Sequence, residues 1–394
     1  MRPLCIVLLT AVVCAGQQFT MPRDAEAVAE LSIRTTGAEW AIATVRIDGA
    51  REQQVIVWAG PVSRTYRIFL GRVTAGSHAL SISGDGVEAG AIRVTASDDP
   101  VIAQAPVLYA RKNTIGRFSD VPLLMYAERE GDALVYTVVF SNEDGGTSTR
   151  ALMARWGRTT DIEYVYRVSP GGAIVQGKDH VDRPFDGRYE DRHPLLMPIT
   201  DNNMIGAATE DATLRFQLAP VLVDLSTSSR EAVMDAEPLT YAVMARELER
   251  EGKLRPFGTV KGENISDVRN YAFFEYRATH KQSAMTVQVA LRDDRVFSGD
   301  LGRVDYAISR DGWVRTTVEL PPRTKPADIA TVGFHCIVAP PVKRGDPMPH
   351  SGTCELQRVS KMFFLDEQYR PGKSLLRIDK PVTIPSGQAV LLKP

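Results

Sequence analysis

Two acidic residues in the middle of the chain have the spacing of side chains that act together. Asp161 and Glu163 open a segment rich in aromatic residues and valine that runs to Val168, which predicts a β-strand. Side chains two residues apart on a strand point to the same face, so both carboxylates would share one surface. Such carboxylates repel each other unless a cation, an arginine or a proton lies between them. The pair therefore predicts a metal site or an acid–base site.

Two polar loops could add further groups to this pair. The predicted strand Tyr136–Phe140 breaks into a loop rich in acids and glycine at 142–147, and the irregular stretch 178–194 contains two histidines. Carboxylates and imidazoles suit calcium, magnesium or manganese, or a general acid and base. The predicted metal ligands are Glu143, Asp144, Asp161, Glu163 and His180. The predicted catalytic residues are Asp161, Glu163, His180, His193 and Arg158.

Each of these groups also has a structural interpretation. The carboxylates of Asp161 and Glu163 could pair with Arg158 and Arg167 in an ordinary cluster of salt bridges. His180 and His193 could each serve only as hydrogen-bonding residues of a loop. The run Asn142-Glu143-Asp144-Gly145-Gly146 could be a simple hairpin turn, because Asp-Gly is a strong turn signal by itself.

The elements that must position these residues are mostly strands. Residues 19–97 contain short alternating segments with turn residues between them, which predicts an Ig-like antiparallel sandwich. An acidic turn at 97–100 marks the predicted boundary. Residues 98–394 predict a larger β-sandwich with one inserted helix, because 238–251 places its apolar residues on one helical face. The predicted strands of this part are 123–127, 134–140, 162–168, 213–218, 272–277, 284–291, 304–309 and 313–320.

The first 18 residues predict a signal peptide. A basic residue precedes a short apolar run, and Val13 and Ala15 suit the −3 and −1 positions of a cleavage site. We therefore expect an exported protein, periplasmic, extracellular or at the cell surface, with lipidation of Cys14 as an alternative. Cys336 and Cys354 bracket a proline-rich loop and predict a disulfide. The alternative for these cysteines is a metal pair completed by His335 and His350.

Charge and hydropathy exclude several partner classes. The chain has 47 basic and 48 acidic residues, so no overall field favours nucleic acid or an anionic membrane. After the leader no apolar run reaches the length of a membrane-spanning helix. We therefore expect no nucleic-acid partner and no transmembrane segment in the mature chain.

The segment 136–168 resembles the core of the necrosis-inducing β-sandwich proteins and their vacuolar-sorting-like relatives. Gly157, Asp161 and Glu163 match the family's pattern of a glycine, polar residues and an Asp-Trp-Glu triplet that leads into a strand. Ile162 stands where the family has tryptophan, and Arg158 and Thr160 stand where the necrosis-inducing proteins have histidine. The resemblance implies a divalent cation that helps to engage a glycosylated lipid. It implies as ligands Asp161 and Glu163, with Glu143 or Asp144 as the loop acid and His180 in place of the missing histidines.

Three functions remain open from the sequence. The first is an exported protein that binds or acts on an extracellular glycan or glycolipid, with a divalent cation held by the acidic residues. The second is a polysaccharide hydrolase or lyase that uses the same carboxylates directly. The third is a non-enzymatic envelope or adhesion protein, which the absence of a nucleophile elbow, a P-loop and a Rossmann fingerprint supports.

Overall fold

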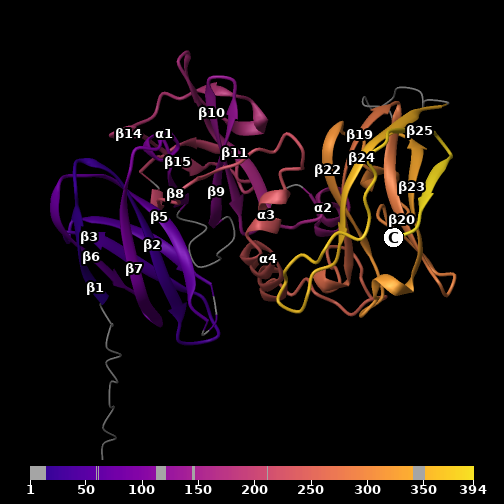
Figure 1. Cartoon of the computed structure of the whole chain (residues 1–394), viewed down its shortest axis with the longest axis horizontal. Coiled ribbons are helices and arrows are strands. Elements are labelled where there is room, and N and C mark those ends of the chain that lie inside the picture. The colour runs from indigo at the N-terminus through magenta and orange to yellow at the C-terminus, as the bar shows by residue number, and fades with distance from the viewer. Residues whose placement is uncertain are drawn as a thin grey trace, which may run out of the picture. The chain divides into compact units, whose positions relative to one another are not determined.

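The structure is a computed structural model that describes residues 15–58, 60, 62–111, 121–143, 147–210, 212–339 and 351–394. Strands predominate in these residues and pair mostly antiparallel, so the predicted all-β fold is confirmed. The chain divides into two compact units (Figure 1). The first unit comprises Met1–Phe140 and Glu163–Val223, and the second comprises Ser141–Ile162 and Asp224–Pro394.

The first unit begins with a small antiparallel sandwich. One sheet has the strand order β1-β6-β3-β4 and the other has the order β5-β2-β7. Strand β3 shows how the sequence builds this core, since every second side chain from Ala41 to Ile47 is buried. The strands are β1 (Ala15–Met21), β2 (Ala25–Thr35), β3 (Ala41–Ile47), β4 (Arg51–Val57), β5 (Arg64–Val73), β6 (Gly76–Ser83) and β7 (Val87–Ser97).

The rest of the first unit contains two more sheets, ordered β13-β12-β11-β10-β9-β18 and β14-β15-β8-β17, with β16 paired to β15. The pairs β15–β8 and β18–β9 are parallel. The elements are α1 (Pro100–Ala103), β8 (Val107–Arg111), β9 (Pro122–Glu130), β10 (Ala133–Phe140), β11 (Asp161–Ser169), β12 (Gly172–Val175), β13 (Arg183–Pro184), β14 (Tyr189–Glu190), β15 (His193–Pro198), β16 (Ile205–Ala207), β17 (Ala212–Phe216) and β18 (Val221–Leu222).

The second unit is built on a sandwich of two four-stranded sheets, β22-β19-β24-β25 and β21-β20-β23-β26. Its core contains Phe274, Tyr276 and Phe334, all fully buried. The predicted disulfide is confirmed, because Cys336 of β23 is bonded to Cys354 of β24 and so links the two sheets. The strands are β19 (Tyr271–Lys281), β20 (Ser283–Leu291), β21 (Val296–Ser298), β22 (Gly312–Glu319), β23 (Ile329–Val338), β24 (Thr353–Phe363), β25 (Val382–Pro385) and β26 (Ala389–Leu392).

Three helices of the second unit accompany this sandwich. The predicted helix is α4 (Leu239–Arg250), with Val243, Met244 and Leu248 buried on its apolar face. Helices α2 (Thr149–Trp156) and α3 (Ala232–Ala236) are additional to those that the sequence predicts. Helix α2 is specified locally, because Ser148 caps its first turn by accepting a hydrogen bond from the backbone of Ala151.

The predicted boundary between residues 97 and 98 falls within the first unit, between β7 and α1, and stays a prediction. One predicted element differs from the observed one. The strand predicted at 304–309 is wrong, because Val304–Tyr306 forms a 3₁₀ turn in which the Val304 side chain is exposed. The predicted leader up to Cys14, and His350, lie outside the described residues. Within the described ranges, no helix is long and apolar enough to cross a membrane.

Candidate functional site

Asp161, the first residue of β11, is buried against an arginine. Its carboxylate oxygen Oδ1 lies 3.9 Å from Nη1 of Arg158, and the side chains are 3% and 2% exposed. Gly157 places this arginine, because it ends α2 in the left-handed conformation with φ of 65°. The same Nη1 also donates a hydrogen bond to the carbonyl oxygen of Thr160. The salt bridge to Arg158 that the sequence offered as an alternative is therefore present.

A second buried carboxylate, Glu231, shares this arginine. Oε1 of Glu231 lies 3.3 Å from Nε of Arg158 and 3.6 Å from Nε of Arg230, and the Glu231 side chain is 3% exposed. Burial works to raise the pKa of Glu231, but Arg158, Arg230 and two further arginines together hold the pKa below its ordinary value. Glu231 is far from Arg158 in the sequence, and no local pattern points to it.

Glu143 belongs to the same cluster and keeps its proton to near neutral pH. Its backbone N–H donates to the carbonyl oxygen of Thr159 at 3.2 Å, which holds the residue beside the start of β11. Burial is the main cause that raises the pKa of Glu143 to about 7, and the negative charge of Asp161 adds to it, while Arg158 opposes it. Asp144, predicted as a ligand alongside it, lies outside the described residues.

Glu163 lies in the first unit and contacts two residues that follow β12, Gln176 and His180. Its Oε2 accepts a hydrogen bond from Nε2 of Gln176 and lies 3.8 Å from Nδ1 of His180. Gln176 Nε2 is also 3.1 Å from that imidazole nitrogen. The Glu163 side chain is 9% exposed and that of His180 is 59% exposed. The structure thus brings Glu163 and His180 together, while Arg167 pairs with Glu130 instead.

The loop that carries His180 is strained at two successive residues. Asp179 and His180 both have positive φ, 59° and 56°, which costs side-chain-bearing residues free energy unless the surroundings impose it. Gly177 begins the loop with φ of 67°, and a Cβ atom there would overlap the carbonyl oxygen of Val181. Only glycine fits this close approach. Among the described residues, the buried Oε1 of Gln176 next to this loop has no hydrogen-bond partner.

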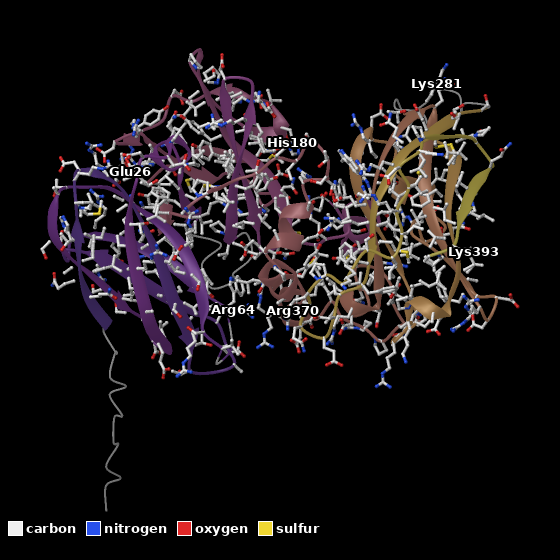
Figure 2. The ribbon with its side chains drawn as sticks, viewed as in Figure 1. Glu26, Arg64, His180, Lys281, Arg370 and Lys393 are labelled. Atoms are coloured by element: carbon white, nitrogen blue, oxygen red, sulfur yellow. A yellow bond between two sulfur atoms is a disulfide. The ribbon has the colours of Figure 1, made fainter. Side chains whose placement is uncertain are left out.

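His193 is a core residue of the first unit. Its Nδ1 lies 2.8 Å from the carbonyl oxygen of Ala105, and its Nε2 lies 3.2 Å from Oε2 of Glu26. The ring stacks on Phe69 at 4.7 Å between centroids, and the His193 side chain is 2% exposed. Figure 2 labels Glu26 and His180 on the ribbon. These contacts give His193 a packing role in the core. They do not support the predicted role of His193 as a catalytic acid.

The described members of the predicted ligand set do not fit a divalent cation. Within the described ranges, no three His, Cys, Asp or Glu side chains are grouped so that they could hold a metal ion. Asp161 faces the guanidinium of Arg158, which already supplies positive charge, and Glu163 accepts from an amide. The division between the two units passes through β11, so that Asp161 is assigned to the second unit and Glu163 to the first. The described residues therefore give no support to the cation that the sequence predicts.

An aromatic cluster, formed by Tyr166, Phe185 and Tyr189, lies on the same hairpin region of the first unit. The Phe185 ring makes edge contacts with the other two rings, with centroids 5.8 Å from Tyr166 and 5.0 Å from Tyr189. The two tyrosine hydroxyls are 3.2 Å apart. Tyr189 is 47% exposed although it is a large aromatic residue. Two of the three rings belong to the loop 178–194, where the acids and histidines gave the stronger chemical signal in the sequence.

A glycine at position 187 leaves room for the Phe185 ring. A Cβ atom at Gly187 would lie 2.6 Å from two carbons of the Phe185 ring and 2.7 Å from Cβ of Ala207. A side chain at 187 would therefore displace the ring. Exposed charged residues of both signs flank the aromatic residues in the sequence; they are Lys178, Asp179, Asp182, Arg183, Asp186, Arg188, Asp191 and Arg192.

Comparisons with known proteins do not assign a family. No family model matches the chain, and no curated protein matches it. It is similar to a ruminal GH26 endo-β-1,4-mannanase, with TM-score 0.20, 10% identity, and coverage of 30% of this chain and 27% of that one. It is also similar to a Paenibacillus sp. cycloisomaltooligosaccharide glucanotransferase complexed with cycloisomaltoheptaose, with TM-score 0.19, 8% identity, and coverage of 94% and 40%. The chain spans less than half the length of either protein, and likenesses this weak carry no argument.

Proposed function

We propose that this chain is an exported protein that binds an extracellular glycan through the aromatic cluster Tyr166, Phe185 and Tyr189. The observation that carries the proposal is the exposure of Tyr189 against a packed Phe185, with charged and polar side chains on the same loop. A sugar ring offers one apolar face and a rim of hydroxyls, and an amphipathic aromatic surface with a polar border complements both.

Two further observations support a ligand at this hairpin. Among the described residues, Oε1 of Gln176 is a buried acceptor without a donor, and leaving such a group unpaired costs about 1–3 kcal/mol. A ligand hydroxyl could supply the missing donor. The strain at Asp179 and His180 is of the kind that concentrates at ligand-binding loops.

The test is a titration of the full chain with a panel of neutral and acidic polysaccharides, followed by calorimetry. We expect Tyr189→Ala to weaken binding about tenfold or more, because an aromatic anchor at the centre of an interface contributes about 1.4 kcal/mol or more. The matched control is Tyr369→Ala, which removes a partly exposed tyrosine from the second unit. Equal loss in both variants, or unchanged binding in Tyr189→Ala, would rule out the aromatic cluster as the site.

A second candidate function, cleavage of a glycan, is favoured by one observation. Burial raises the pKa of Glu143 to about 7 beside the carboxylate of Asp161, and a carboxyl group with a raised pKa can serve as the general acid in glycoside cleavage. The test is release of reducing sugar from the polysaccharide panel. Glu143→Gln should abolish the release and Tyr369→Ala should leave it intact, whereas full activity in Glu143→Gln would exclude this mechanism.

A further inference from the structure

The outer face of one sheet in the second unit presents a row of three large side chains on adjacent strands. Arg277 of β19 is paired in register with Trp313 of β22 on one side and with Arg358 of β24 on the other. Residues paired across antiparallel strands project from the same face of the sheet. Their chain neighbours Tyr276 and Val314 are buried in the sandwich core, so the row points away from it.

The row is accessible from solvent. Arg277 is exposed, and Trp313 and Arg358 are partly exposed. The indole Nε1 of Trp313 donates to the carbonyl oxygen of Ser226 at 3.1 Å, which fixes the orientation of the ring. Adjacent strands are about 4.8 Å apart, so the three side chains cover about 10 Å across the sheet. The surface is therefore wide enough to receive a small ring with its substituents.

The charges of the row are only partly compensated. The Arg277 guanidinium makes no hydrogen bond or ion pair with the residues that the structure describes. Arg358 Nε lies 3.0 Å from Oδ1 of Asp379 but has no aligned hydrogen-bond acceptor in the described part of the chain. Asp379 also pairs with Arg377 at 3.0 Å, and Glu355 accepts from Thr279. Arg358 and Arg377 thus share the single carboxylate of Asp379, and Arg277 has no ion-pair partner among the described residues, so positive charge on this face is left uncompensated.

This arrangement is unfavourable for the fold itself. Like charges directly opposite each other on neighbouring strands destabilise a sheet, and Arg277 and Arg358 are in that position. A guanidinium group offers paired N–H donors that match a carboxylate, and an indole ring packs against the apolar face of a sugar. Two arginines beside a tryptophan on one open face therefore suit a ligand that combines a flat ring with an anionic group.

We propose that Trp313, Arg277 and Arg358 form a second binding surface, which takes a glycan that bears carboxylate groups, such as a chain of uronic acids. This surface lies in the second unit and uses none of the residues of the aromatic cluster. The proposal rests on the proposed glycan-binding function and adds a second site to it. The experiments can refute either site independently of the other.

The experiment titrates the full chain with a short oligogalacturonate and with its methyl ester, using calorimetry and tryptophan fluorescence. The methyl ester keeps the rings and removes the charge. We expect binding of the oligogalacturonate, loss of binding on esterification, and weakening at higher salt. Arg277→Ala should weaken binding about tenfold or more, as expected for a charge-assisted hydrogen bond. Trp313→Phe should abolish the fluorescence change.

Matched variants distinguish recognition by this row from a general attraction between opposite charges. Arg295→Ala removes an exposed arginine of the same unit, with the same change in net charge, and should bind as the unaltered chain does. Tyr369→Ala, which alters neither proposed site, should also leave oligogalacturonate binding intact. Equal binding of the methyl ester, unchanged binding in Arg277→Ala, or equally tight binding of polyglutamate would overturn the proposal. Tighter binding of a sulfated oligosaccharide would overturn the assignment of carboxylate as the recognised group.

Discussion

Replacing Glu143 by glutamine should stabilise the second unit, and only at pH values where the glutamate would ionise. Burial and the charge of Asp161 raise the pKa of Glu143 to about 7 in the folded chain. In the unfolded chain the pKa returns to an ordinary value near 4.5. The folded state therefore holds its proton more tightly than the unfolded state, and glutamine imitates the protonated side chain without ever ionising.

The sign and size follow from this difference. Between pH 4.5 and about 7 the unfolded chain has released the proton and the folded chain still binds it, so the free energy of unfolding falls as pH rises. Each pH unit of the interval contributes about 1.36 kcal/mol, which amounts to about 3 kcal/mol once pH exceeds about 7. Below about pH 4 both states are protonated, and Glu143→Gln should change the stability little. At about pH 8 the variant should be more stable by up to about 3 kcal/mol.

The assay is urea unfolding of both chains at about pH 4 and about pH 8, followed by circular dichroism and tryptophan fluorescence. Glu367→Gln serves as the control, because it neutralises an exposed carboxylate of the same unit. This control should change the free energy of unfolding by no more than about 0.5 kcal/mol at either pH. If Glu143→Gln stabilises equally at both pH values, the effect arises from packing. If it destabilises at the higher pH, burial does not control the ionisation of Glu143 and the predicted sign is wrong.

Three further predictions concern other parts of the chain. Replacing Cys336 and Cys354 by alanine should destabilise the second unit by about 3 kcal/mol in urea unfolding, since their link closes a segment with sequence separation 18. His193→Ala should cost about 3 kcal/mol by the same measurement, because it removes a buried ring that stacks on Phe69 and leaves Glu26 without this hydrogen-bond partner. Calcium, magnesium or manganese should leave the melting temperature unchanged, because Arg158 already neutralises Asp161; a rise that saturates with metal concentration would establish a cation site.

The features that the sequence predicts well depend on short-range patterns. Strand β20, expected at 284–291, is observed at Ser283–Leu291: its first half is buried throughout, and burial alternates from Val287 to Leu291. Helix α4, expected at 238–251, is observed at Leu239–Arg250, because its apolar residues recur with the helical period and are buried on one face. The disulfide is predictable because the chain beyond residue 14 contains only two cysteines.

The features that the sequence does not predict depend on long-range contacts. Glu231 shares Arg158 with Asp161, yet it lies 73 residues along the chain from that arginine. The row of Arg277, Trp313 and Arg358 needs the register of three strands, which no window of sequence contains. Val304 has the residue type of a strand, but the backbone turns there among polar neighbours.

The pair Asp161 and Glu163 shows why a shared strand is not enough to define a site. Both side chains satisfy the expected two-residue spacing, but their surroundings differ. Asp161 has its charge balanced by the buried Arg158, whereas Glu163 contacts an amide and an exposed histidine on a strained loop. A carboxylate with a buried guanidinium partner is already satisfied, and binding a ligand there would require breaking that pair. A ligand that binds at the aromatic cluster around Tyr189 breaks no buried ion pair. Binding at this cluster is therefore the stronger proposal.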